Sequence, residues 1–269
     1  MIGKGEINKI ARQHGIGDPQ IEKDYVITWV LYGISQSQVL REALAFKGGT
    51  VLKKAYFAEY RFSEDLDFTL LDEASANDEI VAEFNKVLAF MQDETGMTLK
   101  ISTEKDKKQG ETHSFNFFID FVGPLQGAMG SRDLKVDVTR KEVLEFPLKE
   151  RKIFTEYSDL QKEFSVKCYT LSEVLIEKMA AVMGRTIPRD VYDLWYLLEV
   201  DAIPLEEHIQ EFERKAKNKN QKPELFKEKL AAKADTYKRD WDKSLGKQIK
   251  DLIDFDELIR QLQKHLRKL

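Results

Sequence analysis

Two aspartates, Asp65 and Asp67, lie two positions apart in the segment RFSEDLDFTLL. The segment alternates apolar and polar residues, which predicts a strand, so both carboxylates should project from one face while Leu66 and Phe68 point into the core. Two adjacent negative charges repel each other unless a cation lies between them. A third carboxylate, Asp137, repeats the arrangement in LKVDVTR. Three carboxylates on two strands suit Mg²⁺, which prefers oxygen ligands and completes its shell with water and substrate phosphates.

A glycine turn upstream is the second feature that suits phosphate chemistry. Lys47, Gly48, Gly49 and Thr50 follow a short apolar run and precede a segment with helical spacing. Unobstructed backbone N–H groups and a helix N-terminus can meet a triphosphate there, and the Thr50 hydroxyl adds a donor. Each feature alone is weak, because tight turns and exposed strand carboxylates are common. Together, in this order, they are a much stronger sign of phosphoryl chemistry.

The elements that must position these residues follow from the hydrophobic periodicity. Apolar residues at helical intervals predict a helix over residues 17–34, with Asp18 as N-cap and Pro19 as the first helical residue, and a second helix over residues 75–94. A short strand over residues 43–46 should run into the glycine turn. Alternating segments predict further strands, and a Gly-rich connection should join the last two as an antiparallel pair; these segments cover residues 98–103, 113–122 and 134–144.

From Thr170 onward the pattern is helical. Thr170 and Glu173 form a capping box, Gly184 is the expected C-cap, and Pro188 starts the next helix. A last amphipathic helix closes the chain over residues 253–269. The sequence therefore predicts an α+β protein with two domains, a mixed α/β domain over residues 1–165 and a helical C-terminal domain over residues 166–269.

Composition excludes several other classes of protein. The 269 residues carry a net charge of −4 and are 42% hydrophobic, which fits a globular protein. The apolar run at residues 25–34 is too short to cross a membrane and the N-terminus lacks a signal peptide, so we expect a cytoplasmic protein without a membrane partner. A single cysteine, Cys168, excludes a disulfide, and the four histidines lack zinc-binding spacing.

The motifs resemble those of a known family when they are taken as a set. FKGGTVLKKAYFAEYRFSEDLDF resembles the signature of the DNA polymerase β-like nucleotidyltransferase superfamily, and most closely that of the AbiEii/AbiGii toxin family, with GGT-x-L-x-K followed by R-x-S-x-D-x-D-F. KVDVTR is similar to the family's third-carboxylate strand, EKMAAVMGRTIPRDVYDLWYL to its K…R…RD-x-x-D helical motif, and IEKDY to its opening. The resemblance runs from about residue 20 to 200 and implies a nucleotidyltransferase-like mixed β-sheet with flanking helices.

This resemblance implies metal-dependent transfer of a nucleoside monophosphate from an NTP to an acceptor hydroxyl. Gly48, Gly49 and Thr50 would hold the β and γ phosphates next to Lys47. Asp65, Asp67 and Asp137 would be the ligands of the metal ion, Mg²⁺ or Mn²⁺. Asp137 would also help to activate the acceptor. Two features depart from the superfamily: residues 50–64 form a longer spacer than in many members, and Thr50 stands where many relatives have Ser.

The helical motif has two interpretations. By resemblance, Lys178 would reach the nucleotide or its phosphates, and Arg185, seven residues further on, would lie near the same face. Arg189, Asp190 and Asp193 crowd the first turn of the next helix, where Asp193 is spaced to pair with Arg189. A structural network that fixes the two helices together is an equally good interpretation of these charges.

Two other charged segments have structural interpretations that compete with functional ones. Glu22, Lys23 and Asp24 of the IEKDY segment are expected at a helix surface or in interdomain contacts. Residues 211–250 hold 13 Lys+Arg against 7 Asp+Glu, which is the footprint expected for a nucleic-acid contact but also fits a solvated helical face.

Three functions remain open. The first is an AbiEii-like toxin of a type IV toxin–antitoxin or abortive phage infection system that nucleotidylates RNA, with the 3′ end of tRNA as acceptor, GTP as one candidate NTP and a cognate antitoxin encoded nearby. The second is transfer to a protein or small-molecule hydroxyl. The third is a regulatory module that binds NTP without turnover, which a third carboxylate argues against.

Overall fold

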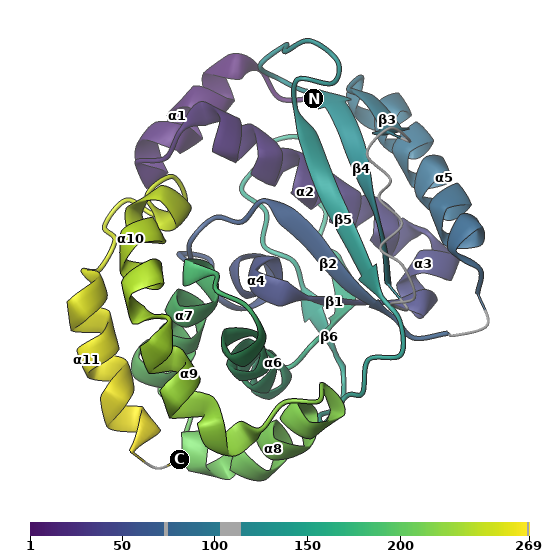
Figure 1. The fold of residues 1–269 in the computed structure, drawn as a ribbon. Helices are drawn as coiled ribbons and strands as arrows, with labels where there is room; N and C mark the ends of the chain where they lie inside the picture. Colours follow the sequence, from purple (N-terminus) through teal and green to yellow (C-terminus); the bar gives the residue numbers. More distant parts are fainter. Residues whose placement is uncertain (73–74, 103–113, 268) are drawn as a thin grey trace. The chain divides into compact units, whose positions relative to one another are not determined.

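The computed structural model describes residues 1–72, 75–102, 114–267 and 269. The chain divides into two compact units (Figure 1). The first unit holds Met1–Glu142 and Leu148–Cys168, and the second holds Val143–Pro147 and Tyr169–Leu269. The sequence-based boundary after residue 165 stays a prediction about independently folding domains.

The first unit is built around a seven-stranded mixed sheet with the strand order β3-β4-β5-β2-β1-β7-β6. Strands β2 and β5 pair in parallel, as do β1 and β7, while the other neighbours are antiparallel. The sequence predicted the antiparallel pairing of β4 with β5. The strands are β1 (Leu44–Lys47), β2 (Asp65–Leu70), β3 (Thr98–Ser102), β4 (Ser114–Val122), β5 (Asp133–Thr139), β6 (Lys149–Lys152) and β7 (Ser165–Cys168).

Helices cover the apolar face of this sheet. The stripe predicted for the helix over residues 75–94 is confirmed, because Phe84 of α5 lies buried between Phe68 and Phe117, with ring centroids 6.4 and 5.0 Å away. Gly33 of α2 packs closely on Val87 of α5, so both helices lie on that face. The helices are α1 (Lys4–His14), α2 (Asp18–Gln36), α3 (Gln38–Ala43), α4 (Gly48–Val51) with a π-helical turn (Leu52–Tyr56), and α5 (Asn77–Thr95).

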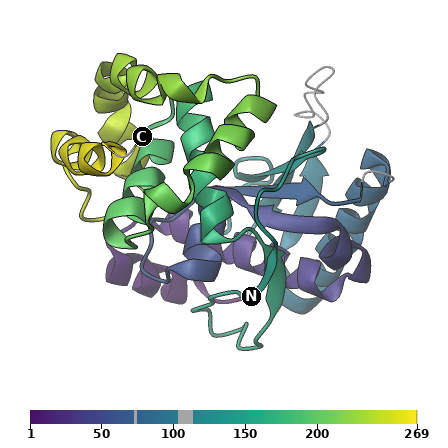
Figure 2. The same cartoon turned by 90° about the horizontal axis from the view of Figure 1, so that it is seen from below.

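The second unit is built from helices joined by loops, and its described residues contain no strand, as the sequence predicts. Figure 2 shows its helices, drawn in green to yellow, gathered as one body. Short 3₁₀ turns at Leu205–Glu207 and Pro223–Leu225 and a π-helical turn at Tyr196–Val200 join or extend them. The helices are α6 (Leu171–Gly184), α7 (Pro188–Trp195), α8 (Ile209–Asn218), α9 (Phe226–Ala232), α10 (Ala234–Leu245) and α11 (Phe255–Leu266).

Several local details differ from the sequence prediction. Strands β6 and β7 were not predicted, and the N-cap of α2 is Gly17 rather than Asp18. Half of the capping box at α6 is present: the Thr170 hydroxyl accepts the Glu173 amide, but the Glu173 carboxylate accepts the amides of Glu145 and Phe146. Residues 103 and 113, at the ends of predicted strands, lie outside the described residues. No helix among the described residues is long and apolar enough to cross a membrane.

Candidate active site

The three predicted carboxylates lie on one face of the sheet. In the parallel pairing of β2 with β5, Asp67 lies opposite Asp137 and Asp65 lies opposite Lys135. Leu66 is fully buried on the other face, whereas the aspartates are half-buried. The register therefore places Asp65, Asp67 and Asp137 together, as the alternation of the two segments predicts.

The register extends this arrangement to both sides. Lys47 of β1 lies opposite Asp67, and Asn116 of β4 lies opposite Asp137, so four side-chain positions form one row across four strands. We call Lys47, Asp67, Asp137 and Asn116 the catalytic row, because the sequence predicts a catalytic role for Asp67 and Asp137; that role is not shown by the register. Asn116 was not predicted, because the alternation in HSFNFFIDFV assigns the face of this residue but only the strand register shows that Asp137 is its neighbour.

The glycine turn approaches the catalytic row closely. Gly48 has a φ of +79°, and a Cβ at this position would lie 2.3 Å from Oδ2 of Asp67. Only glycine combines this backbone conformation with so close an approach. Beside the turn, the nearly buried Lys47 lies with its Nζ 3.7 Å from Oε2 of Glu142. The longer spacer noted in the sequence therefore does not separate the turn from the carboxylates.

Thr50 joins the turn to the strand that carries the first carboxylate. Its buried hydroxyl lies 2.5 Å from the backbone oxygen of Asp65, to which it donates, and 2.8 Å from Oγ of Ser63. In this position the hydroxyl stabilises the turn, and a contact with phosphate would require it to exchange partners. The phosphate-binding roles of Gly48, Gly49 and Thr50 remain predictions.

The donor set fits a divalent cation, although the side chains do not yet converge on one. Among the described residues, no three His, Cys, Asp or Glu side chains are grouped closely enough to hold a metal ion. Oδ2 of Asp137 instead accepts from Nζ of Lys135 at 2.6 Å. Three carboxylates on neighbouring strands are nevertheless the oxygen-rich set that Mg²⁺ or Mn²⁺ prefers, and the ammonium group shows that Asp137 attracts a cation.

Two charged residues of the IEKDY segment, Glu22 and Asp24, are buried in the first unit, so the expectation of surface or interdomain contacts is wrong for them, whereas Lys23 is half-buried. Glu22 forms an ion pair with Arg132 and accepts the Leu125 amide at 2.7 Å, which ties α2 to the connection between β4 and β5. The local spacing could not show this, because both partners lie more than a hundred residues away.

Asp24 contacts a lysine of the π-helical turn that follows the glycine turn. It accepts from Nζ of Lys54 at 2.8 Å and from the Tyr157 hydroxyl at 2.6 Å. Burial alone would raise the pKa of Asp24, but the charges of Lys54 and Lys53 outweigh burial and hold the pKa below its ordinary value. The IEKDY motif and the lysine of GGT-x-L-x-K therefore stabilise each other.

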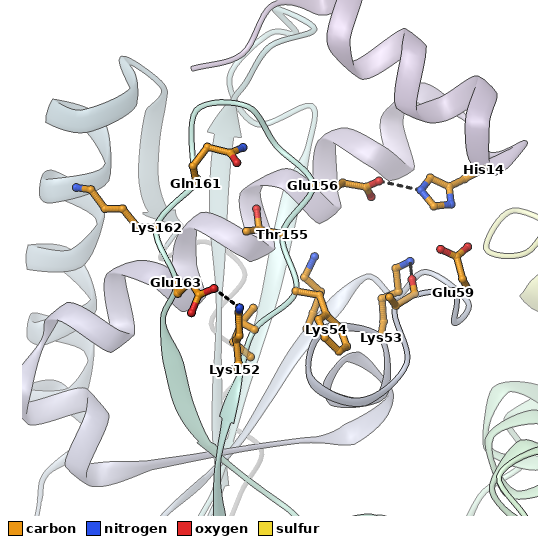
Figure 3. A pocket seen from close by; sticks show the side chains of 13 residues that line it. His14, Lys53, Lys54, Glu59, Lys152, Thr155, Glu156, Gln161, Lys162 and Glu163 are labelled. Atoms are coloured by element: carbon orange, nitrogen blue, oxygen red, sulfur yellow. Dashed lines mark hydrogen bonds and ion pairs between the residues drawn. The ribbon is translucent and has the colours of Figure 1, made fainter.

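A cavity of about 440 Å³ lies beside the π-helical turn Leu52–Tyr56, which continues α4 (Figure 3). Lys53 and Lys54 line it, together with an ion pair between His14 and Glu156. Nζ of Lys53 donates to the backbone oxygen of Ala58 at 2.5 Å, and burial lowers the pKa of this lysine. The described residues that line the cavity include no member of the catalytic row, so the cavity is separate from the candidate active site.

The charged residues of the helical motif form an ion network inside the second unit. Nζ of the buried Lys178 lies 2.9 Å from Oδ1 of Asp190 and 2.7 Å from Oδ2 of Asp193. The half-exposed Arg185 donates from Nε to Oδ2 of Asp190 at 2.7 Å. The network ties α6 to α7 through the ion pair of Lys178 with Asp193, and the pairing of Arg189 with Asp193 that local spacing suggests stays a prediction.

The electrostatics of this network favour the charged form of Asp190. Burial alone would raise the pKa of Asp190, but Lys178 and Arg185 outweigh it and hold the pKa below its ordinary value. Arg185 keeps 56% of its side chain exposed and can still meet a ligand. Phosphate binding by Lys178 and Arg185, with support from Arg189, Asp190 and Asp193, remains a prediction beside the structural role.

The basic segment over residues 211–250 forms α8, α9 and α10, and several of its cations are already neutralised. Lys215 is buried and binds Glu173 at 2.8 Å. Lys217 pairs with Glu213, and Arg239 pairs with its neighbour Asp240. These contacts favour the solvated-face interpretation for part of the segment, and its contact with nucleic acid stays a prediction.

Comparison with known proteins agrees with this fold. JHP933 from Helicobacter pylori is similar in fold, with 15% sequence identity and a TM-score of 0.60 over 94% of this chain and 92% of that chain. MenT4, a nucleotidyltransferase toxin from Mycobacterium tuberculosis, is similar with 16% identity and a TM-score of 0.69 over 100% of this chain and 89% of that chain. No curated protein sequence matches the chain.

The family comparison covers most of the sequence. Residues 29–261 match the family described as nucleotidyl transferase AbiEii toxin of the type IV toxin–antitoxin system. This range includes the glycine turn, the catalytic row and the helical ion network. The protein is therefore a nucleotidyltransferase that belongs to the AbiEii family of type IV toxins.

Proposed function

We propose that this toxin transfers a nucleoside monophosphate from an NTP to a hydroxyl at the 3′ end of RNA, with tRNA as the acceptor and Mg²⁺ or Mn²⁺ as the cofactor. The observation that supports the proposal most is the strand register, which places Asp67 opposite Asp137. Gly48 lies so close to Asp67 that a side chain at this position would collide with the carboxylate. Both proposed substrates occur in the cytoplasm, where the sequence analysis expects the protein.

The chain's own residues supply positioning and charge. Gly48 and Gly49 would leave room for the β and γ phosphates, while Asp65, Asp67 and Asp137 would hold the cation. The bound cation would neutralise phosphate charge and polarise the reacting oxygens. The acceptor oxygen forms a bond to the α-phosphorus, the bond from that phosphorus to the bridging oxygen breaks, and pyrophosphate leaves. Asp137 takes the proton of the acceptor hydroxyl.

The toxin–antitoxin assignment implies a cognate antitoxin as a partner. We propose that this antitoxin need not form a stable complex with the toxin. RNA nucleotidylation would stop growth by removing usable acceptor ends, and an antitoxin that prevents or reverses that effect would restore growth without direct contact.

The proposal is tested by incubating the purified protein with each α-³²P-labelled NTP, Mg²⁺ and total bacterial RNA. We expect label on a discrete RNA with the wild-type protein and its loss in Asp65→Ala/Asp67→Ala. Asp133→Ala is the matched control, because Asp133 lies on the same strand as Asp137 but outside the catalytic row, and it should retain activity.

Each other outcome has a definite meaning. Label on protein or on a small molecule, with none on RNA, would replace the RNA acceptor by the second function. Retained NTP binding with no label and no pyrophosphate release would support the regulatory module. Full activity in Asp65→Ala/Asp67→Ala would contradict the assignment of the site.

A further inference from the structure

Lys135 lies among the three carboxylates, although the sequence analysis gave it no role. It lies opposite Asp65 in the pairing of β2 with β5 and two residues before Asp137 on the same strand. Its Nζ is 2.6 Å from Oδ2 of Asp137. A side chain in this position is adjacent to the first carboxylate across the strands and bound to the third along the strand.

The ion pair between Lys135 and Asp137 is accessible and therefore easily exchanged. The two side chains keep 36% and 32% of their surface exposed. Exposed ion pairs contribute little stability, so another cation can replace the ammonium group at small cost. The buried pair of Lys215 and Glu173, at 1% and 0% exposure, has no such freedom.

A divalent cation and the ammonium group of Lys135 cannot both bind Asp137 without strong repulsion between their charges. A cation that binds Asp137 must therefore displace the ammonium group of Lys135. Once displaced, the ammonium group remains on the face that carries the catalytic row, where the phosphates of a nucleotide would offer it a new acceptor.

We propose that Lys135 is a positioning residue that competes with the divalent cation for Asp137 and thereby couples binding of the cation to binding of the NTP. Without nucleotide, Lys135 neutralises Asp137 and weakens cation binding. With nucleotide, the ammonium group moves from Asp137 to phosphate and the cation binds tightly. This inference rests on the proposed function, because it needs the three carboxylates to be the cation site.

The test measures Mn²⁺ affinity directly, by electron paramagnetic resonance of the free ion, with no reaction required. We expect Lys135→Met to bind Mn²⁺ about fivefold more tightly than the wild-type protein when nucleotide is absent, which is the effect of losing one exposed ion-pair competitor. Addition of a non-hydrolysable NTP should tighten Mn²⁺ binding less in Lys135→Met than in the wild type.

Two variants make the comparison specific. Lys152→Met removes another strand lysine that is paired with a carboxylate, Glu163, on the same unit, and it should leave Mn²⁺ affinity unchanged. In an Asp137→Asn background, Lys135→Met should have no effect, because the shared partner is gone. An unchanged unfolding midpoint for Lys135→Met confirms that the change does not act through the fold.

The outcomes separate this inference from the proposed function. Equal or weaker Mn²⁺ binding by Lys135→Met, in a protein whose Mn²⁺ site is lost in Asp65→Asn/Asp67→Asn, would overturn the role of Lys135 and leave the site intact. Two results would overturn the cation site itself. One is Mn²⁺ affinity that is unchanged in Asp65→Asn/Asp67→Asn, and the other is the absence of Mn²⁺ binding in both the wild-type protein and Lys135→Met.

Discussion

Two charged clusters carry the motifs of this protein, and they are built in opposite ways. In the first unit, Asp65, Asp67 and Asp137 are half-buried on one face of a sheet. In the second unit, Asp190 and Asp193 are almost completely buried, and Lys178 binds both. The first cluster leaves its carboxylates within reach of a ligand, and the second satisfies its carboxylates internally.

The difference shows that a motif of charged residues does not by itself distinguish a reactive site from a structural one. A buried ion pair requires both partners, since removal of one leaves an uncompensated charge in a poorly solvated place. Half-exposed carboxylates on a strand tolerate such losses, because water can solvate the remaining charge. Stability and activity should therefore respond differently to substitutions in the two clusters.

The largest effect on stability is expected for Lys178→Met. The substitution leaves Asp193 buried without its cation, which should cost about 3–5 kcal/mol of unfolding free energy. Urea denaturation followed by tryptophan fluorescence measures this, since Trp195 and Trp241 both lie in the second unit. Lys152→Met removes an exposed lysine and should change the free energy by less than about 0.5 kcal/mol.

A different result would change the comparison. If Lys178→Met keeps the wild-type unfolding midpoint but abolishes transfer, then Lys178 acts on the nucleotide and the second cluster is also a reactive site.

A medium effect is expected for Gly48→Ala. The left-handed backbone costs about 1–2 kcal/mol for a residue with a Cβ, and the new methyl group must also push Asp67 away. Gly130→Ala is a matched control, because Gly130 has a φ of +78° but open space around its Cβ position. We expect nucleotide transfer to fall about a hundredfold in Gly48→Ala and to be retained in Gly130→Ala, by an assay of labelled product.

The smallest effect is expected from acid. The pKa of Asp190 is lower in the folded protein than its ordinary value of 3.8. The charged carboxylate therefore stabilises the second unit above pH of about 4 and ceases to do so as the pH falls through the lowered pKa. Tryptophan emission recorded between pH 5 and about pH 2 should show this loss, and Asp190→Asn should be less stable at neutral pH and less sensitive to acid. Equal acid sensitivity in Asp190→Asn would assign the transition to other groups.

The sequence predicts those features whose signal is local. The alternation around Leu66 and Val136 assigns the carboxylates to one face, and the glycine turn stands where its motif predicts. Strand β6 was missed because its four residues, Lys149–Lys152, are all charged and lie at the sheet edge, where a strand shows no apolar alternation. Strand β7 has four residues, too few for a clear period.

Features that depend on distant partners could not be predicted. Asp24 looks like a surface residue in its helix, yet Lys54 and Tyr157 make its burial favourable. Alternation around Val136 places Lys135 and Asp137 on one face, but only the strand register brings Asp65 beside them. The roles proposed for Lys178 and Arg185 stay predictions, because their ion network is what a structural role and a phosphate-binding role both require.

The parallel pairing of β2 with β5 has a consequence for how the enzyme comes into being. Asp67 and Asp137 lie opposite each other in the sheet, although α5, β3 and β4 separate them in the chain. Closing a loop of that length costs about 4 kcal/mol in chain entropy, which only the completed sheet repays. A partly synthesised chain that ends before Asp133 lacks β5 and with it Asp137, so the catalytic row is incomplete until β5 has been made.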